Sequence, residues 1–115
     1  MKRKDFIVIQ EEDELIRELI ERWLAEAGYA VRPAENESPC LVIANVPSPR
    51  GAHPLIESLR AVYAAPILIL SGRFRRGLGG SAEAARRLGV KKVLPKPFTR
   101  EEFLSAVHEA LEGAG

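Results

Sequence analysis

Short apolar runs alternate along the chain with longer stretches in which apolar residues recur at every third or fourth position. Runs of four to six residues are typical of strands buried on both faces of a parallel sheet, and the longer spacing is typical of helices that pack on that sheet. The predicted strands cover residues 5–10, 29–32, 40–44, 66–70 and 92–94. The pattern therefore predicts an α/β domain in three layers.

The first predicted helix follows the first strand and stops at Gly28, a residue type that commonly ends helices. Its apolar repeat consists of Leu15, Ile16, Leu19, Ile20, Trp23 and Leu24. Three further helices are predicted at residues 54–63, 81–88 and 99–111. Ser81 is the expected N-cap of the helix at 81–88, and Thr99 with Glu102 forms a capping box for the last helix.

The connection between the second and third strands is short, because only six residues separate Pro33 from Cys40. A crossover between parallel strands normally takes a dozen or more residues, whereas six extended residues span about 20 Å. We therefore expect an extended link in place of a helix, which leaves one face of the sheet thinly covered near the first and third strands. Either the exposed apolar surface marks a partner site or other side chains close over it.

The chain has 115 residues, of which 29% are charged, and a formal net charge of +1. Its size fits a single domain, and its charge gives no global field that favours nucleic acid. Cys40 is the single cysteine, so an internal disulfide is excluded and a reducing compartment is indicated. No apolar run approaches the length of a membrane span, and the basic start, Met1–Lys4, leads too soon into acidic residues for a secretory signal. We expect a cytoplasmic protein.

Polar residues follow the predicted strands in a distinctive order. Glu11 and Glu12 come after the first strand, Asn45 after the third, Ser71 after the fourth and Lys96 after the fifth. Because ligands bind parallel α/β sheets beyond the carboxyl ends of the strands, we expect these side chains to converge there. An acidic pair, a strand-end residue, a hydroxyl and Lys-Pro-Phe, in that order, resemble the receiver domain of two-component response regulators (the CheY-like superfamily). The resemblance covers nearly the whole chain except residues 34–39.

The resemblance implies a flavodoxin-like sheet of five parallel strands in the order 2-1-3-4-5, with the helix after the second strand reduced or absent. In that family the residue at the Asn45 position is the aspartate that accepts a phosphoryl group, and an amide is not a carboxylate nucleophile. Val93 stands three places before Lys96, where the family has an aromatic switch residue. The resemblance therefore indicates a degenerate pseudo-receiver that is not phosphorylated at position 45 and has no catalytic residues.

In the same family two aspartates at the positions of Glu11 and Glu12 hold Mg²⁺. Glutamates are one methylene longer, and Mg²⁺ demands near-ideal octahedral geometry at short distances. With Asn45 and the backbone carbonyl at Pro47, the glutamates form a vestigial magnesium site, so we expect no cofactor, or at most weak Mg²⁺ binding. Taken singly, a strand-end asparagine and acids near a helix start also have ordinary structural roles.

Ser71 and Lys96 match the two residues that contact the phosphoryl group in the family. In the absence of that group, Lys96 is expected to bridge Asn45 and one of the glutamates. The favoured function is a stand-alone, non-enzymatic module that signals through protein–protein contact. The alternatives are an active receiver phosphorylated at a non-standard residue, and the regulatory domain of a larger transcriptional regulator.

The resemblance places the partner surface on the helix at 81–88, the strand at 92–94 and the last helix, where a signalling kinase, an output protein or a second copy would bind. Basic residues gather around the first part of this face, and acidic residues lie on the last helix. They are Arg73, Arg75, Arg76, Arg86, Arg87, Lys91 and Lys92, and Glu101, Glu102, Glu109 and Glu112. Opposite signs side by side suit a symmetric dimer, and a solvated charged surface is the alternative. Nucleic acid is not expected, since no recognisable reading helix carries the arginines.

Overall fold

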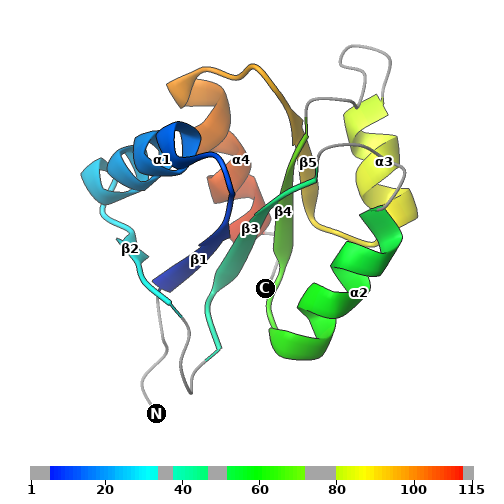
Figure 1. Ribbon diagram of the computed structural model, residues 1–115. Helices are drawn as coiled ribbons and strands as arrows, with labels where there is room; N and C mark the ends of the chain where they lie inside the picture. Colours follow the sequence, from blue (N-terminus) through cyan, green and yellow to red (C-terminus); the bar gives the residue numbers. More distant parts are fainter. Residues whose placement is uncertain (1–5, 34–37, 47–51, 72–79, 113–115) are drawn as a thin grey trace.

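The computed structural model describes residues 6–33, 38–46, 52–71 and 80–112, and Figure 1 shows them as one sheet between two pairs of helices. The strands are β1 (Phe6–Gln10), β2 (Ala30–Val31), β3 (Leu41–Asn45), β4 (Ile67–Ser71) and β5 (Lys92–Pro95). The helices are α1 (Glu14–Glu26), α2 (Ala52–Val62), α3 (Gly80–Leu88) and α4 (Arg100–Glu112). Each predicted element is present, and most differ from the prediction only by small shifts at their ends.

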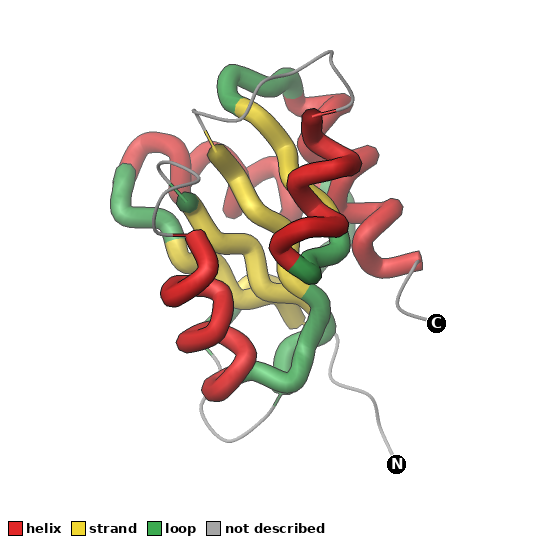
Figure 2. Tube along the Cα trace, turned by 90° about the vertical axis from the view of Figure 1, so that its right-hand side faces the viewer, coloured by secondary structure: helices red, strands yellow, loops and turns green. Residues whose placement is uncertain are grey.

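The five described strands run parallel in the order β2-β1-β3-β4-β5, which confirms the predicted topology. Helices α1 and α4 cover one face of the sheet, and α2 and α3 cover the other (Figures 1 and 2). The strand order reverses between β1 and β3, because the chain passes from β1 to β2 on one side and then to β3 on the other. The carboxyl ends of β1 and β3 are therefore neighbours at the place where open α/β sheets bind ligands.

Buried strand residues alternate between the two faces of the sheet. The residues on the α1–α4 face are Ile7, Leu41, Ile43, Leu68, Leu70 and Leu94. The residues on the α2–α3 face are Phe6, Val8, Val42, Ala44, Ile67, Ile69 and Val93. Because helices cover both faces, the strands must be apolar at every position, and this explains the uninterrupted apolar runs in the sequence.

The helix ends confirm two of the sequence signals and correct a third. The Thr99 hydroxyl accepts a hydrogen bond from the Glu102 amide at 3.0 Å, and the Glu102 carboxylate accepts one from the Thr99 amide at 2.9 Å, which is the predicted capping box. Gly28 follows α1 with a φ of +95°, a conformation that favours glycine. The prediction of Ser81 as an N-cap is wrong, because α3 begins at Gly80 and Ser81 lies inside it.

The apolar repeat of α1 is wider than the stripe that reaches the core. Ile20 and Leu24 are fully buried against the sheet, whereas Leu15 is 79% exposed and Leu19 is 39% exposed. Helical spacing shows that a residue lies on the same side of the helix as the buried residues. It does not show how far around the helix the buried surface extends. Leu15 and Leu19 therefore belong to the helical repeat in the sequence but are not part of the buried core.

The segment between β2 and β3 tests the expectation of a missing helix only in part. No helix is present in residues 32–33 and 38–40, but residues 34–37 lie outside the described residues, so the extended link stays a prediction. On the α2–α3 face, Phe6 is 1% exposed and Val8 is 4% exposed. The Arg32 guanidinium lies 3.9 Å from the centroid of the Phe6 ring and covers it. Of the two alternatives, closure by other side chains is the one that this burial supports.

Candidate functional site

Four predicted site residues occupy the carboxyl ends of neighbouring strands. Asn45 is the last residue of β3, Ser71 is the last of β4, and Glu11 and Lys96 directly follow β1 and β5. The register places Asn45 beside Leu70. Parallel pairing over the whole width from β1 to β5 therefore brings residues that are up to 85 positions apart in sequence to one rim.

The Lys96 side chain joins three of these strand ends. Its ammonium group donates a hydrogen bond to Oδ1 of Asn45 at 2.8 Å and another to Oε1 of Glu11 at 3.3 Å. The predicted bridge from Lys96 to Asn45 and one of the glutamates is thus confirmed, and the glutamate is Glu11. We call these three residues the lysine bridge.

Glu11 is a buried charge with its partners in place. Its side chain is 1% exposed, and the side chain of Lys96 is 23% exposed. The second carboxylate oxygen, Oε2, accepts a hydrogen bond from the Asp13 amide at 3.1 Å. A buried carboxylate stays charged only when a cation and hydrogen-bond donors replace the water it has lost. Lys96 supplies the cation, and the turn into α1 supplies a donor.

The turn that carries Glu11 is fixed by the start of α1. Oδ1 of Asp13 accepts hydrogen bonds from the amides of Leu15 at 3.0 Å and Ile16 at 3.2 Å, so Asp13 is the N-cap of α1. The Arg17 guanidinium donates to the carbonyl oxygen of Glu11 at 3.4 Å. Neither the role of Asp13 as the N-cap of α1 nor its donation to Glu11 was predicted from the sequence. The signal for the cap was present, since Asp13 directly precedes the apolar repeat of α1.

The position of Lys96 is fixed by a backbone hydrogen bond and by the packing of Phe98, two residues later. The Lys96 amide donates to the carbonyl oxygen of Ser71 at 2.7 Å, which continues the pairing of β4 and β5 by one residue. Phe98 lies two positions later, in a cluster with Trp23 of α1 and Phe103 of α4, with ring centroids 5.7 to 6.3 Å apart. The base of the lysine is therefore anchored on both sides, and its side chain extends toward β1 and β3.

The remaining predicted site residues are distributed around the lysine bridge. Ser71 is fully buried at the end of β4, and Val93 is 1% exposed within the core of the α2–α3 face. Glu12 is exposed to solvent. With Glu11, Asn45 and other residues, Glu12 borders an opening of about 380 Å³ at the rim. Pro47, predicted to complete the magnesium shell, lies outside the described residues.

The described residues do not fit a Mg²⁺ ion. Oxygens of Glu11 and Asn45, which the family resemblance assigns to the metal, accept hydrogen bonds from the Lys96 ammonium. In the described ranges no group of three or more His, Cys, Asp or Glu side chains is placed to hold a metal. Because Asn45 is neutral, a cation bound between Glu11 and Asn45 would be repelled at close range by the Lys96 ammonium without a second carboxylate to offset the repulsion. The Lys96 ammonium is itself the positive charge that neutralises the Glu11 carboxylate.

The predicted partner surface carries both signs of charge, as expected. Arg86, Arg87 and Lys91 are exposed on and after α3, and Glu109 is exposed on α4. The Lys92 ammonium lies 2.7 Å from a carboxylate oxygen of Glu109, so part of this charge is paired within the domain. Exposed pairs of this kind contribute about 1 kcal/mol or less to stability. The predicted contributions of Arg73, Arg75 and Arg76 lie outside the described residues.

In the described parts of the chain, no helix has the length and apolar character needed to cross a bilayer. No protein-family model matches the sequence, and no curated protein matches it.

Several solved structures of response regulators and receiver domains have the same fold as this chain. A response regulator receiver protein from Burkholderia phymatum superposes with a TM-score of 0.70 at 23% identity, over 95% of this chain and 96% of that one. A response regulator from Thermotoga maritima gives a TM-score of 0.73 at 18% identity, over 96% and 99% of the two chains. NtrX from Brucella abortus gives 0.72 at 21% identity, over 97% of this chain and 28% of that one. At these identities the similarity shows that the chain has the CheY-like receiver fold.

Proposed function

We propose that this chain is an atypical receiver domain of two-component signal transduction that acts through protein–protein contact, without phosphorylation at position 45. It is a binding module, not an enzyme, and it works in the cytoplasm. The receiver fold and the order of residues at the strand ends support the family. The lysine bridge supports the absence of a phosphoryl group, because the domain neutralises the charge at this site with its own side chain.

The single observation that carries the proposal is the contact of the Lys96 ammonium with both Asn45 and the buried Glu11. In a receiver of the usual type, an aspartate at position 45 and a bound metal would share this space with the lysine. Here the amide of Asn45 cannot form an acyl phosphate, and Lys96 already has two acceptors. Val93, buried in the core, offers no ring that could report a change at the site.

One observation favours the alternative of phosphorylation at a non-standard residue. Glu12 is a solvent-exposed carboxylate in the wall of the opening beside Asn45, where a small phosphodonor would enter. The other alternative, a regulatory domain within a larger regulator, is consistent with NtrX, where the matched region is 28% of that chain. The lysine bridge argues against neither the length of the protein nor its domain content, and it favours the proposed function over phosphorylation at this site.

Incubation with acetyl phosphate and Mg²⁺, followed by intact-mass measurement, tests the proposal. We expect no phosphoryl adduct on the protein. The matched control is Asn45→Asp, which restores the carboxylate, and the same assay on this variant shows whether the rest of the site can still support transfer. A stoichiometric adduct on the unmodified protein that hydroxylamine removes would overturn the proposal, and its loss in Glu12→Gln would assign the acceptor to Glu12.

The proposed contact surface is the face formed by α3, β5 and α4, which would meet a signalling kinase, an output protein or a second copy. Its support is the mixture of exposed basic residues on α3 and exposed acidic residues on α4. Sedimentation equilibrium at low and high salt tests the homodimer, because opposite charges that pair between copies lose attraction as salt rises. A molecular mass equal to the monomer at all salt concentrations would exclude self-association and leave a different protein as the partner.

A further inference from the structure

We propose that the lysine bridge is the precursor of a covalent cross-link, in which Nζ of Lys96 replaces the side-chain nitrogen of Asn45. The product is an isopeptide bond between the end of β3 and the segment that joins β5 to α4. The cross-link rests on the proposed function in one respect, because it requires that position 45 carries no phosphoryl group.

The amine and the amide that would react are already in contact. Nζ of Lys96 lies 2.8 Å from Oδ1 of Asn45. The carbonyl bond from Oδ1 to Cγ adds about 1.2 Å, so Nζ is within about 4 Å of the carbon that it would attack. Rotation about the Cβ–Cγ bond of Asn45 turns the face of the amide toward Nζ. Groups held in this way react within one molecule, at an effective concentration of about 10⁵–10⁸ M when they are well oriented.

Glu11 is placed to accept the proton that keeps Lys96 from reacting. An ammonium nitrogen has no lone pair, so Nζ must lose a proton before it can attack a carbonyl carbon. Oε1 of Glu11 lies 3.3 Å from Nζ, and the Glu11 side chain is 1% exposed. Transfer of a proton from Nζ to Oε1 turns a buried ion pair into two neutral groups, which need less solvation than the charged groups do.

The reaction balances without a co-reactant. Neutral Nζ attacks Cγ of Asn45 and forms the new Nζ–Cγ bond, and the Cγ–Nδ2 bond breaks. Glu11 carries the two protons that Nζ loses to the departing nitrogen, which leaves as ammonium, and the Glu11 carboxylate is restored. Nζ keeps one hydrogen as the amide N–H, and nothing is oxidised or reduced. Glu11 and Asn45 both border the opening at the rim, through which the ammonium leaves.

The backbone opposes the competing reaction of asparagine. In that reaction the next amide nitrogen in the chain, here that of Val46, attacks Cγ and forms a succinimide. The Val46 amide instead donates to the carbonyl oxygen of Leu70 at 2.8 Å, which continues the pairing of β3 with β4. The main-chain nitrogen is therefore engaged with β4, and the amine of Lys96 is the nucleophile that the structure brings to Asn45.

The cross-link would hold the carboxyl ends of three strands together. Lys96 and Asn45 are 51 positions apart in the sequence. The Lys96 amide already donates to the Ser71 carbonyl oxygen, so the bond joins β3 to a segment that is itself paired with β4. A cross-link that closes a long loop restricts the unfolded chain, and it stabilises the folded state. A receiver locked in this way would present one fixed surface to its partners.

Intact-mass measurement during prolonged incubation of the folded protein tests the proposal. We expect a species that is lighter than the sequence mass by about 17 Da, the mass of ammonia, and a fraction of it that rises with time. Trypsin cleaves the chain into peptides that include residues 23–50 and 93–100, which carry Asn45 and Lys96. In the lighter species these two peptides are expected as one branched product, identified by fragmentation in the mass spectrometer.

Two variants and a control assign the reacting groups, and circular dichroism shows that each is folded before its mass is compared. Lys96→Arg keeps the positive charge but has no primary amine, so its mass is expected to stay unchanged. Glu11→Gln cannot accept the proton and is expected to slow the cross-link at least about tenfold. Lys92→Arg is the matched control, since Lys92 pairs with Glu109 on the surface, and it is expected to cross-link as the parent does.

The full sequence mass in the folded parent after prolonged incubation would overturn the cross-link and leave the proposed function intact. A loss of about 17 Da that persists in Lys96→Arg would also overturn it, because the product would then be a succinimide. Separate peptides 23–50 and 93–100 in the lighter species would have the same meaning. A phosphoryl adduct, in contrast, adds mass and contradicts the proposed function.

Discussion

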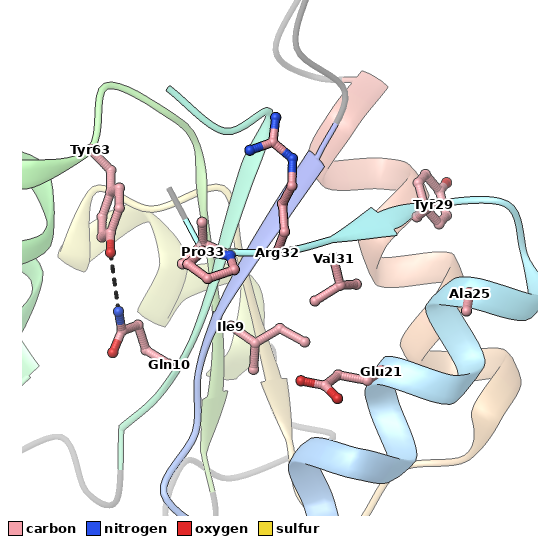
Figure 3. Close-up of a pocket in the computed structure, with 10 residues that line it drawn as sticks. Ile9, Gln10, Glu21, Ala25, Tyr29, Val31, Arg32, Pro33 and Tyr63 are labelled. Atoms are coloured by element: carbon pink, nitrogen blue, oxygen red, sulfur yellow. Dashed lines mark hydrogen bonds between the residues drawn. The ribbon is translucent and has the colours of Figure 1, made fainter. Parts of the chain in front are cut away.

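Glu11 and the last residues of β1, which directly precede it, differ in how their surroundings are filled. Glu11 has its polar groups satisfied within the domain, by Lys96 and by the Asp13 amide. Just before it, Val8, Ile9 and Gln10 of β1 line a cavity of about 540 Å³ together with residues of α1 and β2 (Figure 3). We call it the β1 cavity. The carboxylate of the first site is neutralised by the protein's own lysine, whereas the β1 cavity is bordered mostly by side chains that make no such pair. The comparison teaches that the polar groups at the carboxyl ends of the strands are satisfied within the domain, and that the space beside β1 is held in a different way.

The largest expected effect comes from removing the cation of the lysine bridge. Lys96→Met leaves the Glu11 carboxylate buried without a countercharge, so we expect the free energy of unfolding to fall by about 3 kcal/mol. Urea denaturation monitored by circular dichroism measures the change. Lys92→Met, which breaks the exposed pair with Glu109, is the matched control and should lower stability by less than about 1 kcal/mol.

A double variant separates loss of charge pairing from loss of packing at the same site. Lys96→Met combined with Glu11→Met replaces both partners by apolar side chains, and we expect most of the lost stability to return. If the double variant is as unstable as the sum of the two single variants, the contact between Lys96 and Glu11 does not stabilise the fold. The lysine bridge would then make no contribution to the free energy of unfolding.

A smaller effect is expected at the margin of the β1 cavity, which Arg32 lines. Arg32→Ala removes the guanidinium from the Phe6 ring and exposes part of that ring, so we expect a loss of about 1 kcal/mol in thermal or urea unfolding. Arg22→Ala, at an exposed position of α1, should change stability by less than about 0.5 kcal/mol. Equal effects of the two variants would show that Arg32 does not cover the core.

The smallest effect is expected at the wall of the β1 cavity formed by Gln10 and Tyr63. Tyr63→Phe removes the hydroxyl that accepts from Gln10 but keeps the ring, and the hydrogen bond is exposed to solvent. We expect a change in the free energy of unfolding within about 0.5 kcal/mol, measured in the same urea experiment. A loss above about 1.5 kcal/mol would contradict the comparison, since the polar groups of the β1 cavity would then stabilise the fold about as much as those of the lysine bridge.

The sequence predicted the sheet and the lysine bridge for a shared physical reason. Strands buried on both faces must be apolar throughout, so the runs that end at Gln10, Asn45 and Ser71 were easy to recognise. Once the strands are parallel, their carboxyl ends meet at one rim. The positions of Glu11 and Lys96 relative to Asn45 then follow from the topology.

The extent of β2 and the β1 cavity beside it were not predictable in the same way. The expected second strand, 29–32, is longer than β2, which covers Ala30–Val31. Pairing of an edge strand depends on backbone geometry at Arg32 and Pro33 that apolar patterning does not encode. The exposure of Leu15 has a similar origin, because helical spacing predicts a helix but not the width of its buried stripe. Sequence patterns therefore described the interior of the domain better than its margins.

The ring cluster beside the lysine bridge gives the domain a built-in optical reporter. Trp23 is the single tryptophan of the chain, and its ring centroid lies 6.3 Å from that of Phe98, two residues after Lys96. A ligand or partner that moves the backbone at Lys96 also moves the segment that carries Phe98, and with it the surroundings of the indole. Emission from Trp23 will therefore shift when that segment moves, and an unlabelled protein can be followed as it responds.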